Sequence, residues 1–429
     1  MTANHSKSVI IPLISILVLL SFERVSEAIP VFARKYRTSC MTCHSVFPKL
    51  NPFGEAFRRN GYQIPEVDKR YVQEKPIKLG APAWKEVWPE GVWPGELPKI
   101  PPISLFARSF YRYDEDSQVK HDLTLPDEIK LLSAGTLGED ISFFGGVALV
   151  KDGNNFGGVE KLFLQFDNLF ADSLPAHLIN IKIGQFEPGI IPLSKHRRIT
   201  HKKYLFSTTE VGENNFTLSD QRGVEVNGLV RSRTEYAFGI VNGNGTGSID
   251  ESTGSLDNNS KKDLYLKMGY KFGGVGLDGS GVEKGLLPGD WKERSIHIGA
   301  FGYIGENRID PSAKIDDRFY RYGLNFNLVY RDINILGTVI SGSHKNPNGD
   351  SQERDIFTYL VESDIYFYPW LIGIFRYDFF DVEGAQKSDD IIIGLTALVR
   401  ANVKLVFEGE LHSIGGGGDR AFVMLEFVL

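Results

Sequence analysis

Apolar and polar side chains alternate with a period of two from Ile103 to Leu429, segment after segment. In residues 320–330, one face carries only Tyr, Leu and Phe, and the other carries Arg, Gly and Asn. Residues 264–272 and 403–412 repeat this pattern, with Lys, Glu and His on the polar face. A two-residue period indicates strands. Charges opposite aromatic residues favour a transmembrane barrel, apolar outside and polar inside, over the alternative of a soluble sandwich.

The connections between these segments alternate in length, as outer-membrane barrels require. Tight turns are expected at 230–233, 330–332, 368–370 and 400–402, and longer polar loops around 242–261, 305–317, 343–354 and 381–388. Residues 273–291 break the rule, because a short turn is needed there. We predict an all-β fold, a transmembrane antiparallel barrel of about 16 strands. The last strand spans 421–429, and the even count places both barrel ends on the periplasmic side.

Composition supports a barrel over a soluble enzyme. The 429 residues include 45 Gly, 29 Phe and 17 Tyr, but few Met and only two Cys. No second apolar segment reaches the length of a membrane-spanning helix, which argues against a helical membrane protein. The formal charge of −6 is mild for this length and argues against a nucleic-acid partner.

Residues 1–28 read as a secretory signal peptide. Lys7 supplies the positive flank, residues 9–22 form the apolar stretch, and residues 26–28 resemble a small-x-small cleavage site. The apolar run is too short for a confident membrane span, so we expect cleavage and a mature chain that begins near Ile29. The protein should therefore be exported from the cytoplasm.

Both cysteines lie in Cys40-Met41-Thr42-Cys43-His44, which has the spacing of a c-type haem attachment site. Each thiol can add to one vinyl group of the haem, and His44 then sits under the iron as its proximal ligand. The alternatives are a redox Cys-x-x-Cys pair and half of a zinc site. Zinc would need two further ligands nearby, and a redox pair has no need of His44.

The following residues predict a short helix. Asn51 can cap it, Pro52 is tolerated at its first position, and Gly61 is a plausible left-handed stop. Phe53 and Phe57 share one face, and we expect it to cover a haem edge beside Phe47 and Leu50. The alternative is an ordinary small helix on the barrel rim. Arg58 and Arg59 are either partners of the haem propionates or ordinary surface arginines.

Residues 31–34, 40–44, 47–57 and 61–62 together resemble the haem region of fused cytochrome–porins, outer-membrane monohaem cytochromes associated with ferrous iron oxidation. The Phe-Pro-x-Leu-Asn-x-Phe-Gly pattern after the haem motif is the most specific part. The resemblance covers about 35 residues. It implies a haem segment joined to an outer-membrane barrel, passing electrons between an extracellular donor, Fe(II) by resemblance, and a periplasmic carrier. Such a segment is too small to fold alone, so we expect it in or against the barrel lumen.

The expected organisation is a signal peptide (1–28), a c-type haem segment (29–64), a linker rich in Pro and Trp (65–102) and the barrel (103–429). Proline at the density of the linker excludes a long helix or a central strand. Its tryptophans, Trp84, Trp88 and Trp93, are expected against the barrel wall or the membrane interface, the alternative being an ordered surface loop.

Residues 181–186 resemble a strand common among porins, and a long cationic loop follows that includes residues 195–203. This loop either folds into the lumen, where its cations attract anions or haem propionates, or is a solvated extracellular loop. The sequence leaves the sixth haem ligand open. Met268 falls on the lipid face and Met41 is badly placed between the cysteines; the remaining candidates are His196, His201, His297, His412 and Met424.

Three functions remain in view. The first is an electron conduit across the outer membrane with one haem c and possible Fe(II)-oxidising activity. The second is a solute-conducting porin with an appended haem segment. The third is a haem peroxidase, which is disfavoured because no distal acid–base pair is recognisable. The donor, the direction of electron flow, the reduction potential, solute conduction and the oligomeric state are not determined by the sequence.

Overall fold

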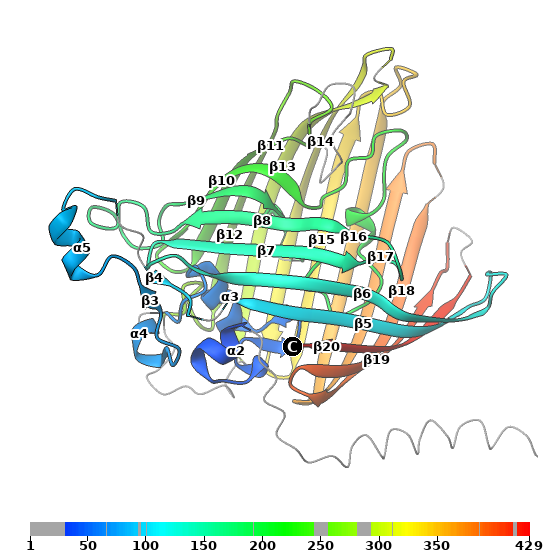
Figure 1. Ribbon diagram of the computed structural model, residues 1–429. Helices are drawn as coiled ribbons and strands as arrows, with labels where there is room; N and C mark the ends of the chain where they lie inside the picture. The colour runs from blue at the N-terminus through cyan, green and yellow to red at the C-terminus, as the bar shows by residue number, and fades with distance from the viewer. Residues whose placement is uncertain are drawn as a thin grey trace, which may run out of the picture.

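Sixteen antiparallel strands close into one barrel (Figure 1). The computed structural model describes residues 31–65, 67–92, 96–99, 101–191, 193–243, 256–280, 293–310, 312–385, 387–414 and 418–429. Each strand pairs with its neighbour in sequence, and β20 pairs with β5 to complete the ring. The predicted fold class is therefore confirmed, and the first barrel strand begins at Ile103. The expected signal peptide and the expected mature start near Ile29 lie outside the described residues.

The strands of the barrel are β5 (Ile103–Asp114), β6 (His121–Thr136), β7 (Ile141–Val150), β8 (Gly158–Phe166), β9 (Asn180–Phe186), β10 (Gln221–Val230), β11 (Thr234–Val241), β12 (Asp263–Gly273), β13 (Arg294–Asp310), β14 (Ile315–Tyr330), β15 (Ile333–His344), β16 (Arg354–Tyr368), β17 (Leu371–Val382), β18 (Ser388–Arg400), β19 (Val403–Leu411) and β20 (Arg420–Val428).

The two faces of the wall have opposite chemistry. On β14, Leu324 points outward and is 65% exposed, whereas its neighbour Arg321 points inward and is 1% exposed. Met268 of β12 is likewise outside, at 56%, while Lys404 of β19 is fully buried inside. An apolar exterior around a charged interior is the pattern of a transmembrane barrel, and it follows directly from the two-residue alternation of the sequence.

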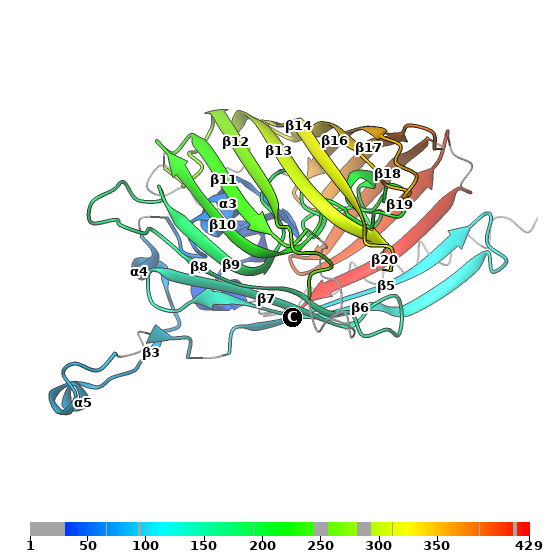
Figure 2. The ribbon, with the colours of Figure 1, turned by 90° about the horizontal axis from the view of Figure 1, so that it is seen from above.

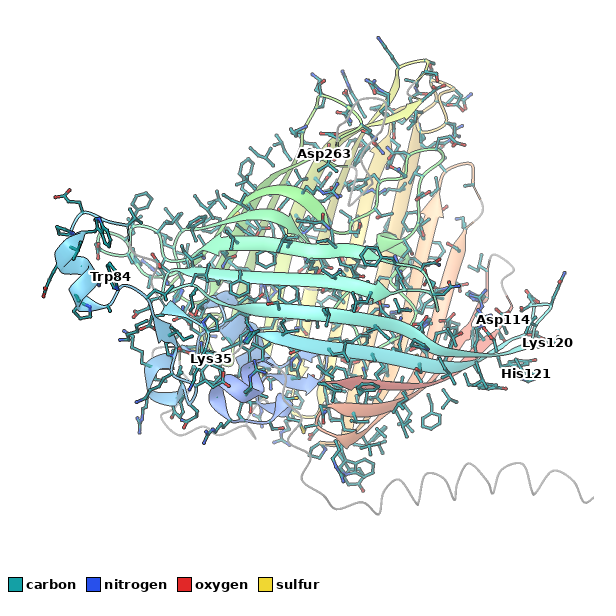
Figure 3. The ribbon with its side chains drawn as sticks, viewed as in Figure 1. Lys35, Trp84, Asp114, Lys120, His121 and Asp263 are labelled. Carbon is teal, nitrogen blue, oxygen red and sulfur yellow. The ribbon has the colours of Figure 1, made fainter. Side chains whose placement is uncertain are left out.

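The barrel has two distinct ends. At one, here called the turn end, strands are joined by tight connections at 231–233, 331–332, 369–370 and 401–402, as predicted. Both the start of β5 and the end of β20 lie there. At the other, the loop end, longer connections project. Figure 3 shows Lys35 near the turn end, and Asp114, Lys120 and His121 at the loop end.

The predicted long loop at 305–317 is wrong. Strands β13 and β14 continue through most of it, so that only residues 311–314 connect them. The physical reason is a ladder of opposite charges across the strand pair. Arg308 Nε lies 2.5 Å from Asp316 Oδ1, and Arg318 Nε lies 2.6 Å from Glu306 Oε2. Such cross-strand pairs stabilise polar strands beyond the apolar belt.

The irregular connection between β12 and β13 contacts the N-terminal segment. Its residues 281–292 lie outside the described residues, but 274–280 fold back toward the N-terminal segment. The amide of Leu277 donates to Ser232 O at 2.7 Å, and the side chain of Asn60 donates to Asp278 O at 2.8 Å. A tight turn is absent here because this connection supports the N-terminal segment.

The N-terminal segment lies inside the barrel at the turn end (Figure 2). It contains α2 (Val31–Tyr36), the 3-10 turn η1 (Cys40–Thr42), a small hairpin β1 (His44–Val46) and β2 (Lys49–Leu50), and α3 (Pro52–Arg59). Val31 N donates to Ser104 Oγ of β5 at 3.0 Å, and Val46 packs in a buried cluster with Tyr366 and Ile372 of the wall.

The first part of the linker stays beside α2, where Tyr36 Oη donates to Asp68 Oδ1 at 2.5 Å, and the rest forms an arm outside the barrel (Figure 1). The linker contains the short helices α4 (Asp68–Tyr71) and α5 (Pro82–Val87) and the two-stranded β3 (Ile77–Lys78) and β4 (Glu96–Leu97). Trp84, labelled in Figure 3, stacks on Trp88 with ring centroids 5.2 Å apart, and both stay about half exposed. They do not pack on the barrel wall, and the expected membrane-interface location stays a prediction. Trp93 lies outside the described residues. Among the described helices, none has the length and apolar character needed to cross a membrane.

Candidate haem attachment site

The two cysteines share one tight turn. Ser39 Oγ accepts a hydrogen bond from Met41 N at 3.3 Å, and Cys43 N donates to Cys40 O at 3.2 Å, which winds residues 40–42 into a 3-10 turn. Side chains three residues apart eclipse one another in this conformation. The thiols of Cys40 and Cys43 therefore lie on the same side of the turn, and both residues line a cavity.

Asn51 ties this turn to helix α3. Its Oδ1 accepts from Gly54 N at 2.8 Å, which caps the helix, while its Nδ2 donates to Thr42 O at 3.1 Å. Its backbone amide also donates to Cys43 O at 3.0 Å. The predicted cap, Pro52 at the helix start and the left-handed Gly61 (φ 63°) are all present. One buried side chain thus fixes both the helix and the Cys-x-x-Cys turn.

Glycine is required at position 54 because α3 lies very close to the backbone of Cys43. A Cβ atom built on it would lie 2.0 Å from Cys43 O, far inside van der Waals contact. Helix α3 can therefore rest directly on the backbone of the Cys-x-x-Cys-His turn only when residue 54 has no side chain. Asn51 and Gly54 together give a physical reason for the Asn-x-Phe-Gly part of the sequence pattern.

His44 offers a neutral imidazole. Its Nδ1 is buried and, within the described residues, has no hydrogen-bond partner. Burial lowers the pKa of His44 to about 4, despite the nearby backbone of Pro48 and Lys49. Burial also raises the pKa of the Cys43 thiol to about 12, unlike the activated thiolate of a redox Cys-x-x-Cys pair. Two thiols on one side of a turn followed by an enclosed, uncharged imidazole fit covalent haem.

A cavity of about 1790 Å³ adjoins the turn. Cys40, Cys43 and His44 line it from the N-terminal segment, and the inner barrel wall and residues of the connection between β9 and β10 line most of the rest. Sites for drug-sized ligands measure about 300–1,000 Å³, so this space accommodates a porphyrin with room left over. Phe53 and Phe57 line it too, as the sequence suggested, but Phe57 also packs edge-on against Phe32 at 4.9 Å. Whether this face covers a haem edge stays a prediction.

Two lysines fix the hairpin of the segment to the wall. Lys49 forms an ion pair with Asp364 of β16 and lies 3.9 Å from Glu362. Lys404 of β19 donates to Phe47 O at 2.9 Å and lies 2.9 Å from Glu426. Because these charges are buried, each needs its partner, and the segment is held in one position within the lumen.

The loop between β9 and β10 (residues 187–220) also folds into the lumen, which selects one of the two alternatives left open by the sequence. Glu408 of β19 accepts from the amides of His201 and Lys202 at 2.7 and 2.9 Å. Asp378 of β17 accepts from Leu205 N at 2.7 Å. The apolar side chains of the loop join a large core cluster on the inner wall, among them Ile190, Ile191, Leu193, Phe206 and Phe216.

The candidate distal ligands fall into separate places. Met268 is on the outer surface, as expected, and Met424 is enclosed in a cluster with Phe110 and Phe422. His412 lies 3.1 Å from Asp390 and is not among the residues that line the cavity. The histidines that line the cavity with His44 are His196, His201 and His297. The structure therefore leaves three candidate distal ligands that line the cavity, and it does not select one of them.

Sequence reasoning missed the partners of the segment. The sequence placed Lys49 and Glu55 in the haem segment but assigned them no partner in the barrel, and it related Arg197 to the haem only as one cation of a loop that enters the lumen in one of two alternatives. Lys49 meets a carboxylate more than 300 residues away in the chain, and no local period encodes such a pair. The only available signal was the requirement that a charge inside a barrel must meet an opposite charge.

No protein-family model and no curated protein sequence matches the chain. Solved structures do resemble it. The anion-selective porin from Comamonas acidovorans aligns with a TM-score of 0.51 at 9% identity over 76% of this chain and 99% of its own. Salmonella typhi OmpF in complex with daunomycin aligns with a TM-score of 0.54 at 11% identity, over 76% of this chain and 97% of its own. The outer membrane channel DcaP of Acinetobacter baumannii aligns with a TM-score of 0.51 at 11% identity, over 76% of this chain and 96% of its own. At these identities the likeness is one of fold, and the barrel is a porin-type barrel.

Proposed function

We propose that the chain is an outer-membrane monohaem c-type cytochrome fused to a porin-type barrel, which passes electrons from an extracellular donor to a periplasmic carrier. The observation that carries the proposal is the position of the Cys40–His44 turn inside the lumen, beside a cavity and fixed to the wall by Lys49 and Lys404. A strand wall provides no redox group of its own, whereas a redox group in the lumen shortens the distance between the two sides.

Haem, when bound through Cys40, Cys43 and His44, supplies a one-electron carrier. The chain contributes its position and surroundings. Asn51 and Gly54 hold the attachment turn against α3, Phe53 and Phe57 line the cavity beside it, and the loop 187–220 crosses the lumen. This arrangement favours electron transfer at a fixed site over turnover of a bound substrate.

The membrane assignment is supported by the outward face of the barrel. Aromatic residues gather on the exposed surface near the turn end, for example Tyr330, Tyr368 and Trp370, as in the aromatic girdle of an outer-membrane barrel. With the turn end toward the periplasm, the haem segment enters from that side. The donor Fe(II) rests on the family resemblance alone, and no residue is assigned to bind it.

Two measurements test the proposal. The protein is exported in a bacterium that carries out c-type haem maturation, and its intact mass is measured after denaturation beside a variant with Cys40→Ala and Cys43→Ala. We expect one covalent haem on the wild type and none on the variant. Stopped-flow mixing of the oxidised protein with Fe(II) should then give the absorbance change of haem reduction. A mass without haem would overturn the proposal, and failure of reduction at the working pH of the cell would overturn Fe(II) as donor.

A solute-conducting porin with an appended haem segment is the second candidate function. The likeness to solved porins and the large cavity favour it, and the comparisons taken alone favour it over the conduit. Planar-bilayer recordings of the haem-loaded protein distinguish the two candidates. A large, steady conductance supports the porin function, and a low conductance supports a lumen closed by the segment and the loop.

A further inference from the structure

A cluster of ion pairs joins α3, the lumen loop and the wall beside the attachment turn. Glu55 of α3 accepts from Arg58 at 2.9 Å and lies 3.4 Å from Arg59. The third cation at this carboxylate is Arg197, which comes from the loop 187–220 and lies 3.7 Å away. Arg59 continues to Glu235 of β11 at 3.1 Å, so the cluster connects three separate parts of the chain.

The charges of this cluster do not balance. Its cations are Arg58, Arg59, Arg197 and Lys267, and its carboxylates are Glu55 and Glu235. Lys267 Nζ is 2.5 Å from Glu235, which His297 also approaches at 3.1 Å. Four cations against two carboxylates leave an excess of two positive charges. Cations collected inside a barrel need counter-charges, and this cluster lacks two.

The neighbouring groups do not supply the missing charge. Lys161 and Lys195 are matched by Glu187 and Asp220, and Lys271 is matched by Glu293. Near Tyr62, Asp167 accepts from Ser142 and Gln165 and, within the described residues, forms no ion pair, so it does not neutralise an arginine of the cluster by direct contact. The excess therefore belongs to the cluster at Glu55.

Two of the arginines keep donors free toward the cavity. The side chains of Arg58 and Arg197 are 31% and 27% exposed, and both line the cavity with Cys40, Cys43 and His44. Among the described residues, the guanidinium of Arg197 donates no hydrogen bond, although its backbone amide donates to Ser194 O, and its contact with Glu55 is a loose ion pair at 3.7 Å. A guanidinium with unused donors is suited to bind a carboxylate through two parallel hydrogen bonds.

We propose that Arg58 and Arg197 bind the two propionate groups of the haem, and that the loop 187–220 thereby forms part of the haem site. Two propionates carry two negative charges, which match the excess of the cluster. The inference rests on the proposed function, because it requires a haem at Cys40 and Cys43. It extends that function by assigning a haem-binding role to a residue some 150 positions away in the sequence.

The test uses full-length, haem-loaded protein with Arg58→Gln or Arg197→Gln. The control is Arg318→Gln, which removes an arginine that pairs with Glu306 at the loop end and is 74% exposed. Because thioether bonds do not depend on arginine, each variant should keep its haem by intact mass. Removing a cation beside the haem disfavours the reduced form, so the ferrous-to-ferric ratio at a fixed solution potential should fall by roughly threefold to tenfold. Tenfold corresponds to about 59 mV for one electron.

A second readout detects direct contact. The propionate bending bands of the resonance Raman spectrum should shift in Arg58→Gln and Arg197→Gln but not in the control. Arg197→Lys should restore most of the potential, because it keeps the charge, but not the band, because it loses the paired donors. If both glutamine variants carry haem with the potential and the bands of the wild type, the inference is overturned and the proposed function stands. A wild type without haem overturns both.

Discussion

At the scale of single residues, the attachment turn depends on an absent side chain. Gly54 lies so close to Cys43 O that any Cβ would force α3 away from the turn. Asn51, which bonds both partners, would then lose one of its two contacts. Gly54 has no side chain to form contacts, and its role follows only from the packing of α3 on the turn.

Gly54→Ala should therefore reduce haem attachment without preventing barrel formation. The clash should destabilise the packing of α3 on the Cys-x-x-Cys turn by about 1–3 kcal/mol. The measurement is haem per protein, from the Soret absorbance and the intact mass. Gly302→Ala is the matched control, because a Cβ at Gly302 meets no atom within 4 Å. Equal haem content in the two variants would contradict this role of Gly54.

Lys49 permits a second test at this scale. Lys49→Met leaves the buried carboxylate of Asp364 without its cation, whereas Glu362 keeps Arg376 at 3.9 Å, and breaking a buried pair in this way costs about 3–5 kcal/mol. We expect the N-terminal segment to leave the lumen more often and to be cut faster by added protease. Adding Asp364→Asn removes the unpaired charge and should slow cleavage again. Cleavage as slow as that of the wild type in Lys49→Met alone would show that this pair does not hold the segment.

At the scale of elements, backbone hydrogen bonds hold the lumen loop on the wall in addition to the ion pairs of its cations, such as Lys202 with Asp390 at 3.2 Å. Glu408 accepts two consecutive amides, from His201 and Lys202, and Asp378 accepts a third, from Leu205. The sequence suggested the position of the loop from its charges, but left open whether it enters the barrel. These acceptors on distant strands decide the question.

Glu408→Ala should loosen the loop. It leaves two buried amides without an acceptor, at about 1–3 kcal/mol each. We expect larger and more frequent conductance steps in planar bilayers than for the wild type. Asp381→Asn is the control, because Asp381 pairs with Lys387 near the loop end of β17. Identical traces from the two variants would rule out Glu408 as an anchor of the loop.

The sequence predicted elements well where a local rule acts. The period of two placed strands β5 to β20 and their faces, and Asn51, Pro52 and Gly61 bounded α3. It failed at 305–317, because polar residues suggest a loop when the opposite charges that pair them across two strands are not recognised. It also could not place the partners of the haem motif, since contacts such as Lys49–Asp364 and Arg197–Glu55 follow from barrel closure and not from any local pattern.

At the scale of the whole molecule, the N-terminal segment and the barrel stabilise one another. The N-terminal segment is too short to bury an adequate core by itself, and a sixteen-stranded barrel encloses more space than its own wall side chains fill. Residues 31–62 occupy part of that space at the turn end, and the loop 187–220 crosses the lumen. A barrel filled in this way favours transfer of electrons over passage of solutes.

The measurement that tests this account most directly uses vesicles that contain the haem-loaded protein, a trapped cytochrome as electron acceptor and a trapped fluorescent solute. Fe(II) is added outside, and absorbance and fluorescence are recorded together. The control vesicles contain the variant with Cys40→Ala and Cys43→Ala. We expect the trapped cytochrome to be reduced only with the wild type, while the solute is retained. Solute escape that accompanies the reduction, or equal reduction with the variant, would contradict the account.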